Sequence, residues 1–254
     1  MAESPVTERP VALVTGGSRG IGAAVVLAAA EAGYDVVINY SARSEAAEDV
    51  ASAAREAGAR TLVVRADVAD ESAVVAMFAA VDTEFGRLDL LVNNAGIAGG
   101  YGPLDSVTAG TLERLWAVNI TGPFLCAREA AARMRSDRGG RGGNIVNISS
   151  KAAALGGPFE WVHYAASKGA IDTMTIGLSK ELAGFGVRVN GVRPGLIESD
   201  FHDHAPPGRI ERIAPSVPMQ RAGTAAEVAA AVLWLASEGA SFVTGAWIDV
   251  TGGR

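Results

Sequence analysis

The stretch Val11-Ala-Leu-Val-Thr-Gly-Gly-Ser-Arg-Gly-Ile-Gly22 decides the fold. Residues 11–15 form a short apolar run, which predicts a buried strand. Residues 21–32 are apolar on almost every side and are followed by Gly33, which predicts a helix and its end. The glycine-rich turn between these segments therefore joins a strand to a helix, as at the start of a βαβ unit.

The same alternation continues along the chain. Further strands are predicted at residues 35–40, 60–66, 88–92, 144–148, 187–192 and 246–250. Helices are predicted at residues 44–57, 71–85, 108–135, 162–183 and 224–237. The 108–135 region can break near Gly122-Pro123, and the last helix begins with a capping box of Thr224 and Glu227. Residues 194–218 are rich in proline and polar groups and predict an irregular, mobile segment.

Strands alternating with helices imply right-handed crossovers and a parallel sheet. We therefore predict an α/β fold of the Rossmann type, with a single doubly wound parallel sheet of about seven strands and helices on both faces. The length of 254 residues and the hydrophobic content of 49% suit one large domain. We place that domain, for dinucleotide binding and catalysis, at residues 9–254, after a disordered lead-in at residues 1–8.

Charge and composition argue against several classes of partner. The net charge is −6 and no basic run is present, so nucleic acids and anionic membranes are poor partners. No run of about eighteen apolar residues and no signal-peptide core occur, which predicts a cytoplasmic protein. The single cysteine, Cys126, excludes an internal disulfide, fits a reducing compartment and is interpreted as a small buried apolar side chain.

The turn after the first predicted strand has the glycine spacing of Gly16, Gly20 and Gly22. A strand-to-helix turn directs backbone N–H groups and the positive end of the helix at one point. Glycines there leave room for a pyrophosphate to approach the backbone. An ordinary tight turn is the alternative interpretation, because a glycine string alone is weak evidence.

Cofactor choice depends on the end of the second predicted strand. An acidic residue there would accept hydrogen bonds from a ribose 2′-hydroxyl and repel a 2′-phosphate. This chain instead has Tyr40 at that position, with Arg43 close by and Arg19 inside the glycine-rich turn. Because an arginine fork suits a phosphate, we predict NADP(H) in preference to NAD(H), which stays possible. Either arginine could instead be a solvated surface residue.

Tyr164 and Lys168 are four residues apart in a predicted helix, so they share one face. An ammonium beside a phenol favours the phenolate and lowers the tyrosine pKa from about 10. A tyrosine with such a pKa can exchange a proton with a substrate oxygen. A pair of this spacing on an exposed helix is more often plain surface.

Four motifs together resemble the short-chain dehydrogenase/reductase family from about residue 11 to residue 253. They are the turn at residues 15–22, Asn93-Asn94-Ala95-Gly96, Ser149-Ser150 with Tyr164-x-x-x-Lys168, and Pro194-Gly195. The closest likeness is to NADP-preferring members, the β-ketoacyl-carrier-protein reductases and glucose dehydrogenase-like enzymes. The resemblance implies hydride transfer between NADP(H) and an alcohol/carbonyl substrate by a Ser-Tyr-Lys-Asn mechanism without metal.

The resemblance also assigns the catalytic roles. Tyr164 would be the general acid/base, and Lys168 would hold the nicotinamide ribose and lower the tyrosine pKa. Ser150 would bind the substrate oxygen, but Ser149 stays an alternative because the gap from Ser150 to Tyr164 is one residue longer than usual. The main chain of Asn119 would hold a water that links Lys168 to solvent.

The implied cofactor contacts come from the ends of several predicted strands. Asp67 and Val68 would recognise adenine, Asn93 and Gly96 would line the adenosine-ribose side, and residues 194–199 would cover the nicotinamide. The full predicted set is Gly16, Ser18, Arg19, Gly20, Ile21, Gly22, Tyr40, Arg43, Asp67, Val68, Asn93, Ala95, Gly96, Tyr164, Lys168, Pro194, Gly195, Ile197 and Ser199.

The substrate and the direction of reaction stay open. A 3-oxoacyl-carrier-protein reductase would need a basic patch for its acidic partner, for which Arg209 and Arg212 are thin support. A sugar or polyol dehydrogenase is the other leading expectation. A non-catalytic dinucleotide-binding module typically loses the tyrosine or lysine, and both are present here. A dehydratase or epimerase usually carries an extended substrate domain, for which this chain is short.

Three further expectations concern the surroundings of the site. Phe159 and Trp161 could wall the substrate pocket or simply pack under a loop. His202 and His204 have metal-binding spacing, but we interpret them as solvated loop residues because no ligand cluster completes a site. The apolar C-terminal helix and strand resemble the parts of the family that form a homotetramer.

Overall fold

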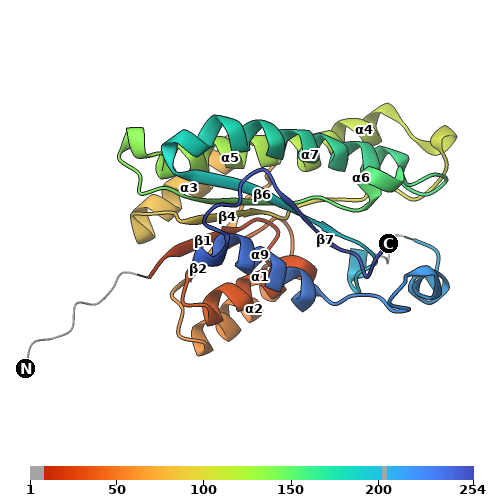
Figure 1. Ribbon diagram of the computed structural model, residues 1–254, viewed down its shortest axis with the longest axis horizontal. Coiled ribbons are helices and arrows are strands. Elements are labelled where there is room, and N and C mark those ends of the chain that lie inside the picture. The colour runs from red at the N-terminus through yellow and green to blue at the C-terminus, as the bar shows by residue number, and fades with distance from the viewer. Residues whose placement is uncertain (1–8, 202–204) are drawn as a thin grey trace, which may run out of the picture.

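The computed structural model describes residues 9–201 and 205–254. The lead-in predicted at residues 1–8 and the pair His202 and His204 lie outside the described residues. In the described part, seven parallel strands form one sheet in the order β3-β2-β1-β4-β5-β6-β7 (Figure 1). The strands are β1 (Val11–Val14), β2 (Asp35–Tyr40), β3 (Thr61–Arg65), β4 (Leu90–Asn93), β5 (Gly143–Ile148), β6 (Val187–Pro194) and β7 (Trp247–Val250).

Helices cover both faces of this sheet, which confirms the predicted fold class (Figure 1). One face carries α1 (Gly20–Glu31), α2 (Ser44–Glu56) and α9 (Ala225–Ala236). The opposite face carries α3 (Glu71–Phe85), α5 (Gly122–Met134) and α7 (Val162–Leu182). Three shorter helices, α4 (Ala109–Trp116), α6 (Ala152–Leu155) and α8 (Arg209–Ile213), lie in the connections.

The first strand shows how the sequence specifies these layers. All four residues of β1 are buried, because the sheet is covered on both faces. Successive side chains of a strand point to opposite faces, so Ala12 and Val14 join the core under α1, α2 and α9. Val11 and Leu13 join the core under α3 and α5. Burial of each Val or Leu side chain contributes about 1.5–3 kcal/mol, so the apolar run stabilises both layers at once.

Two predicted segments gain detail from the structure. Residues 108–135 are a long helical region, as predicted, made of α4, a π-helical segment at Ala117–Thr121 and α5, which begins at Gly122. Residues 194–218 are not simply irregular, because they contain α8 and a 3₁₀ turn at Ala214–Ser216. The reason is local burial, since Ile210 and Ile213 pack with Val217 against Leu196 in a small third core.

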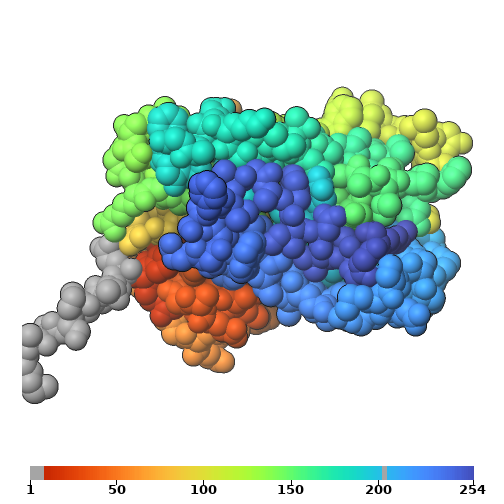
Figure 2. Space-filling model, in the orientation of Figure 1, coloured from red at the N-terminus to blue at the C-terminus, as the bar shows by residue number. Residues whose placement is uncertain are grey.

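The parallel arrangement brings the carboxyl ends of β1 to β6 to one edge of the sheet. Loops that follow different strands meet there, at the place where ligands bind in open α/β sheets. In Figure 2, α9 and β7 form the surface between the two helix layers on the face shown. No helix in the described residues has the length and apolar character needed to cross a membrane.

Candidate active site

A cavity of about 750 Å³ lies along the carboxyl edge of the sheet. Its lining comes from the segments that follow β1 to β6, together with α7 and the region of α8. All predicted catalytic and cofactor-binding residues line it except Asn93 and Asn119. The fold therefore gathers residues that are up to about two hundred positions apart in the chain, as a doubly wound sheet does at its ligand edge.

The glycine-rich turn at the end of β1 is packed so closely that side chains are excluded. A Cβ on Gly22 would overlap the carbonyl oxygen of Gly16, and Gly16 itself has a φ of 63°. A Cβ on Gly20 would come no nearer than 3.8 Å to other atoms, so this part of the backbone is open to the cavity. In the described residues, no side chain caps the first turn of α1. The first N–H groups of α1 thus suit a pyrophosphate.

Polar residues at neighbouring strand ends hold this turn in place. The Gly16 N–H donates to Asn39 Oδ1 (3.2 Å), and Asn94 Nδ2 donates to the carbonyls of Thr15 (2.9 Å) and Gly16 (3.1 Å). The Thr15 hydroxyl oxygen accepts from the N–H groups of Asn94 and Ala95, both at 3.0 Å. Sequence reasoning missed the support from Asn39 and Thr15, although a polar residue at the end of a buried strand is a usable signal.

Two arginines meet at the end of the cavity beside β2. Arg19 forms an ion pair with Asp200, and Arg43 Nη1 lies 3.5 Å from the same carboxylate oxygen. The side chains of Arg19 and Arg43 are 44% and 62% exposed, so a ligand can reach both guanidinium groups. Asp200 follows Ser199 in the loop over the cavity. From this loop its carboxylate reaches both guanidinium groups.

Helix α7 supplies the tyrosine and the lysine. Tyr164 and Lys168 both line the cavity with Ser150, which follows β5, and the Ser150 hydroxyl is close enough to the Tyr164 phenol to act on its pKa. Lys168 is buried and its Nζ donates to the carbonyl of Ile148 at 2.8 Å. That Nζ lies 5.7 Å from the centroid of the Tyr164 ring. The predicted pair thus shares one helix face, and it is not exposed surface.

The pKa of Tyr164 does not shift in the predicted direction. Burial raises the pKa of this phenol to about 12, and the hydrogen bond from Ser150 opposes part of that rise. The predicted lowering was wrong because the ammonium of Lys168 is directed at the Ile148 carbonyl, so burial of the phenolate dominates. Burial also lowers the pKa of Lys168 to about 8, against the attraction of the Asp172 carboxylate.

The structure distinguishes the two candidate serines. Ser149 Oγ donates to Asp172 Oδ1 at 2.6 Å and to the Lys168 carbonyl at 3.1 Å. Ser150 is the one that reaches the Tyr164 hydroxyl. Between Ser150 and Tyr164 the chain passes through a glycine turn after α6, where Gly156 and Gly157 both have positive φ.

The two predicted asparagines lie beneath the cavity. Asn119 is fully buried in the π-helical turn, where its side chain bonds both backbone groups of Ile97 at 2.9 Å. Asn93 does not line the adenosine-ribose side, so that prediction needs correction. Its amide donates to Asn147 Oδ1 (2.9 Å) and to the Pro123 carbonyl, because the last side chain of β4 turns toward α5. The next residue, Asn94, lines the cavity instead.

Aromatic rings surround the other end of the cavity. Ring centroids lie 5.3 Å apart for Tyr101 and Trp161, 5.4 Å for Trp161 and Phe201, and 5.3 Å for Tyr164 and Phe201. Trp161 therefore lines the cavity and also packs against neighbouring rings. Phe159 lines the cavity mouth and is 82% exposed. Edge-on and tilted contacts at these distances favour a rigid, flat-walled space.

Arg209 does not form the exposed basic patch expected for it. Its guanidinium lies over the Trp161 ring at 4.7 Å, and its Nη2 bonds Glu160 Oε2 at 2.6 Å. The side chain is only 11% exposed. Glu160 also accepts from the Tyr101 hydroxyl at 3.5 Å and from the Gly102 N–H through its backbone, so this ion pair joins three loops around the aromatic wall.

Comparisons with known proteins identify the family of this chain. Residues 16–254 match a family model described as "Enoyl-(Acyl carrier protein) reductase". The chain is 51% identical to "Uncharacterized oxidoreductase YgfF" of Escherichia coli K12, over 96% of this chain and 99% of that protein. It is 38% identical to "3-oxoacyl-[acyl-carrier-protein] reductase FabG" of Staphylococcus aureus, over 95% and 96% of the two chains.

Solved structures give the same result. A short-chain type dehydrogenase/reductase from Mycobacterium marinum superimposes with a TM-score of 0.90 at 34% identity, over 96% of this chain and 94% of that one. A short-chain dehydrogenase/reductase from Serratia marcescens gives a TM-score of 0.88 at 35% identity, over 96% and 97%. The chain therefore belongs to the short-chain dehydrogenase/reductase family and is an NAD(P)-dependent oxidoreductase that transfers hydride.

Proposed function

We propose that this enzyme uses NADP(H) to interconvert a small, largely apolar carbonyl compound and its alcohol, with reduction as the favoured direction. The proposal depends most on one observation, that Ser150 and Tyr164 both line the cavity and that the Ser150 hydroxyl is close enough to lower the pKa of the Tyr164 phenol. This places two O–H donors where one substrate oxygen can meet both. The turn with Gly16, Gly20 and Gly22, together with the loop at Pro194 and Gly195, would hold the dinucleotide along the rest of the cavity.

In the proposed mechanism, the dinucleotide supplies the hydride when bound. The Ser150 hydroxyl orients the carbonyl oxygen, and Tyr164 gives its proton to that oxygen as the carbon is reduced. With a pKa of about 12, Tyr164 holds its proton at neutral pH, as an acid in reduction must. The Lys168 ammonium would stabilise the phenolate that remains, and the main chain of Asn119 would hold the water through which the proton returns.

The preference for NADP(H) is supported by the two arginines beside β2. Arg19 and Arg43 converge on one carboxylate, that of Asp200, and a 2′-phosphate has the charge and geometry to replace it. The β2 strand ends in Tyr40, which offers no carboxylate to a ribose 2′-hydroxyl. The adenine contacts are proposed for Asp67 and Val68, with Ser18, Ile21, Ala95 and Gly96 beside the phosphates and ribose, and Ile197 and Ser199 near the carboxamide.

Catalytic efficiency with the two cofactors tests this preference. We expect kcat/KM to be at least about tenfold higher with NADPH than with NADH, because a phosphate gains charge-assisted bonds that a hydroxyl cannot. Arg43→Ala should remove most of this difference by lowering efficiency with NADPH alone. Arg65→Ala is a matched control, because Arg65 is also at the end of a neighbouring strand and bonds the Ser41 carbonyl. Equal use of both cofactors by the unaltered enzyme would reject the proposal.

The aromatic wall supports an apolar carbonyl substrate. Tyr101, Trp161 and Phe201 offer ring faces, whereas a sugar would need several hydrogen-bonding partners for its hydroxyls. The similarity to the Staphylococcus aureus reductase favours a 3-oxoacyl-carrier-protein substrate as the second candidate. Against it, Arg209 at the wall is neutralised by Glu160 and does not face an acidic partner.

A substrate screen separates these candidates. NADPH oxidation would be followed by absorbance with aromatic and alicyclic ketones, β-ketoacyl thioesters and sugars at matched concentrations. We expect the apolar ketones to give the highest kcat/KM and the sugars the lowest. A preference for the carrier-bound thioester over the free ketones would replace the first candidate with the second.

We also propose a cytoplasmic homotetramer. The exposed apolar side chains include Trp116, Phe124 and Ile176 on α4, α5 and α7, and Trp234 and Phe242 at and after the end of α9. Two separate self-complementary surfaces are what a tetramer with two kinds of two-fold contact requires. The cytoplasmic location rests on the cysteine count, since the one cysteine, Cys126, allows no internal disulfide and fits a reducing compartment.

A further inference from the structure

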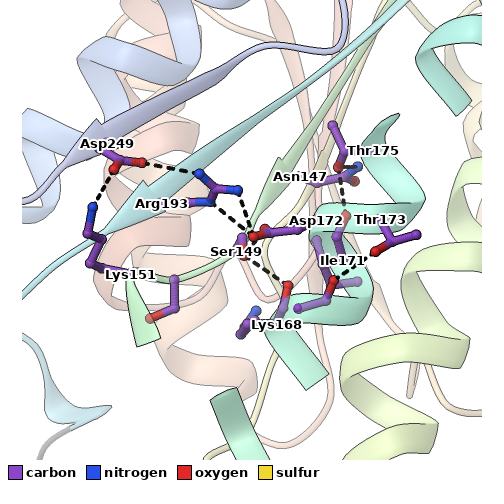
Figure 3. Close-up of polar contacts among 12 residues, drawn as sticks. Asn147, Ser149, Lys151, Lys168, Ile171, Asp172, Thr173, Thr175, Arg193 and Asp249 are labelled. Carbon is purple, nitrogen blue, oxygen red and sulfur yellow. Dashed lines mark hydrogen bonds and ion pairs between the residues drawn. The ribbon is translucent and has the colours of Figure 1, made fainter. Parts of the chain in front are cut away.

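Asp172 continues the face of α7 that carries the proposed catalytic pair. It lies one turn beyond Lys168 and two turns beyond Tyr164, so the three side chains point toward the same side of the helix. Figure 3 shows its carboxylate between Ser149 and Arg193. The side chain of Asp172 is 17% exposed, and the cavity lining does not include it.

The carboxylate of Asp172 holds the serine turn on one side. Its Oδ1 accepts the hydroxyl of Ser149 at 2.6 Å, and Ser149 is the direct neighbour of Ser150. Its Oδ2 accepts from Arg193 Nε and Nη2 of β6, at 3.1 and 2.8 Å. One carboxylate thus joins the turn after β5, the helix α7 and the strand β6.

The ion-pair chain then returns to the same turn from the other side (Figure 3). Arg193 Nη1 lies 3.8 Å from Asp249 Oδ1 of β7, and its guanidinium is over the Trp247 ring at 4.4 Å. Asp249 Oδ2 accepts from Lys151 Nζ at 2.7 Å. Ser149 and Lys151, the two neighbours of Ser150, are therefore both attached to one chain of alternating charges.

The turn needs this attachment because Ser150 and Tyr164 come from different elements. Backbone bonds tie the turn to β6, from the Ser149 N–H to Val192 and from the Lys151 N–H to Pro194, both at 2.9 Å. These bonds do not fix it relative to α7. The Ser149 hydroxyl, shared between Asp172 and the Lys168 carbonyl, joins the turn to the tyrosine helix, next to the bond from Lys168 Nζ to the Ile148 carbonyl.

We propose that Asp172 is a positioning residue that acts through Ser149 to hold the Ser150 hydroxyl at the Tyr164 phenol, with Arg193 orienting its carboxylate. This inference rests on the proposed roles of Ser150 and Tyr164. Two nitrogens of Arg193 donate to the same oxygen, Asp172 Oδ2, which leaves Oδ1 directed at the Ser149 hydroxyl. A displacement of about 1 Å at a reacting oxygen can reduce a rate about a hundredfold. Small movements of the Ser150 hydroxyl are therefore expected to change turnover.

The charge of Asp172 acts on Lys168 as well. Asp172 faces Lys168 from the same helix, and Tyr164 lies one turn before Lys168. Arg193, on β6, carries a positive charge that opposes part of the effect of Asp172. The Lys168 Nζ itself meets the Ile148 carbonyl of β5. Asp172 favours the protonated amine against burial. Without that carboxylate charge, the pKa of Lys168 should therefore be lower. The rate of reduction should then decline at a lower pH as well.

The test is a double-mutant cycle on turnover with NADPH and the best ketone from the screen. Asp172→Asn keeps the shape of the side chain and removes the charge, and Ser149→Ala removes the hydroxyl. We expect each single variant to lower kcat by about tenfold or more, with the KM for NADPH within about twofold of the unaltered enzyme. The double variant should lose no more than the larger single loss, because both changes cut one connection.

Asp82→Asn is the matched control. Asp82 of α3 receives two bonds from Arg133, at 2.8 and 2.7 Å, so this variant breaks another carboxylate–guanidinium pair that is not part of the cavity lining. We expect its kcat to be unchanged and its melting temperature to fall by no more than that of Asp172→Asn, because the Asp82 side chain is 48% exposed. Asp172→Asn should in addition move the alkaline limb of the pH–rate profile to lower pH, which neither Asp82→Asn nor Ser149→Ala should do.

Several outcomes would overturn the inference. The first is a kcat of Asp172→Asn within twofold of that of the unaltered enzyme. The second is a double variant whose fold-loss in kcat equals the product of the two single fold-losses. If Asp172→Asn does not fold, Ser149→Ala decides alone, and full turnover in it rejects the role. Tyr164→Phe separates this inference from the proposed function, because an inactive Tyr164→Phe enzyme together with a fully active Asp172→Asn enzyme rejects only the positioning role.

Discussion

At the scale of single residues, burial governs the chemistry of the site. Tyr164 and Lys168 are both buried, and burial favours the uncharged form of each side chain. It therefore raises the pKa of Tyr164 and lowers the pKa of Lys168. The phenol is therefore a stable proton donor near neutral pH, whereas the amine begins to lose its charge near pH 8. A site of this kind suits the proposed protonation of a carbonyl oxygen better than removal of a proton from an alcohol.

The pH dependence of reduction follows from these shifts. Reduction uses the protonated forms of Tyr164 and Lys168, so activity is present below both pKa values and is lost as pH rises. Because the pKa of Lys168 is about 8 and that of Tyr164 about 12, Lys168 should set the first decline. We expect kcat/KM for reduction to be flat near neutral pH and to fall with an apparent pKa of about 8.

Initial rates at constant ionic strength across this range provide the measurement. Lys168→Met should have low activity and no decline at that position. A kcat/KM that instead rises through pH 8 would show that a deprotonated group is required, and would contradict the assignment of Tyr164 as the acid.

Residue identity was easier to predict than residue orientation. The glycine turn, Tyr164 and Lys168 follow from local spacing, because turn and helix geometry fix their neighbours, whereas Ser150 was chosen from the family resemblance. Asn93 and Asn94 show the limit, since two adjacent asparagines point to opposite sides and only the packing of α5 decides which one meets the cavity. The direction of the Tyr164 shift was missed for the same reason, because burial depends on elements remote in sequence.

At the scale of elements, capping and local apolar patterns account for what the sequence predicts well. The capping box of α9 is confirmed, with the Glu227 N–H donating to Thr224 Oγ1 and the Thr224 N–H donating to Glu227 Oε2. Helix α8 was not predicted, because it is five residues long and its apolar residues pack only on a core made by other loops. Short helices of this kind depend on tertiary contacts more than on their own sequence.

The N-terminal cap of α9 gives a stability prediction. This helix packs along α1 and β5 in the main core, so fraying of its first turn loosens buried contacts. Thr224→Ala should lower the free energy of unfolding by about 1 kcal/mol, the usual effect of losing a threonine cap. Urea unfolding followed by circular dichroism measures it.

Thr83→Ala is the control for this change. Thr83 is exposed near the end of α3, and its hydroxyl bonds only the Ala79 carbonyl of its own helix. Alanine is the better helix former there, so this variant should be as stable as the unaltered protein or slightly more so. Equal destabilisation by the two substitutions would mean that the Thr224 cap contributes nothing specific.

At the scale of the whole molecule, the order of the strands places the site. Parallel strands collect their carboxyl ends at one edge, and the fold class and the edge itself could be predicted from the alternation of strands and helices. Of the aromatic wall only Trp161 was anticipated as one alternative, since Tyr101 and Phe201 come from other connections. The ion-pair chain through Asp172 had one sequence signal, its position four residues after Lys168.

The exposed apolar groups give a prediction for assembly. Light scattering coupled to size-exclusion chromatography should give four times the chain mass of 25.9 kDa. Phe124→Glu should lower the mass, because it places a charge in the proposed contact of α4, α5 and α7. Val75→Glu, on an exposed position of α3, should leave the mass unchanged. A monomeric mass for the unaltered protein would reject the tetramer.

The turnover of Tyr164→Phe tests the central claim most directly. The substitution removes one hydroxyl and keeps the ring that contacts Phe201, so the cavity should stay intact. We expect kcat for NADPH-dependent ketone reduction to fall by about 10²–10⁴-fold, the usual contribution of a general acid. NADPH binding, measured by fluorescence titration, should stay within about twofold of the unaltered enzyme. Undiminished turnover in this variant would contradict the proposal that the Tyr164 phenol protonates the substrate.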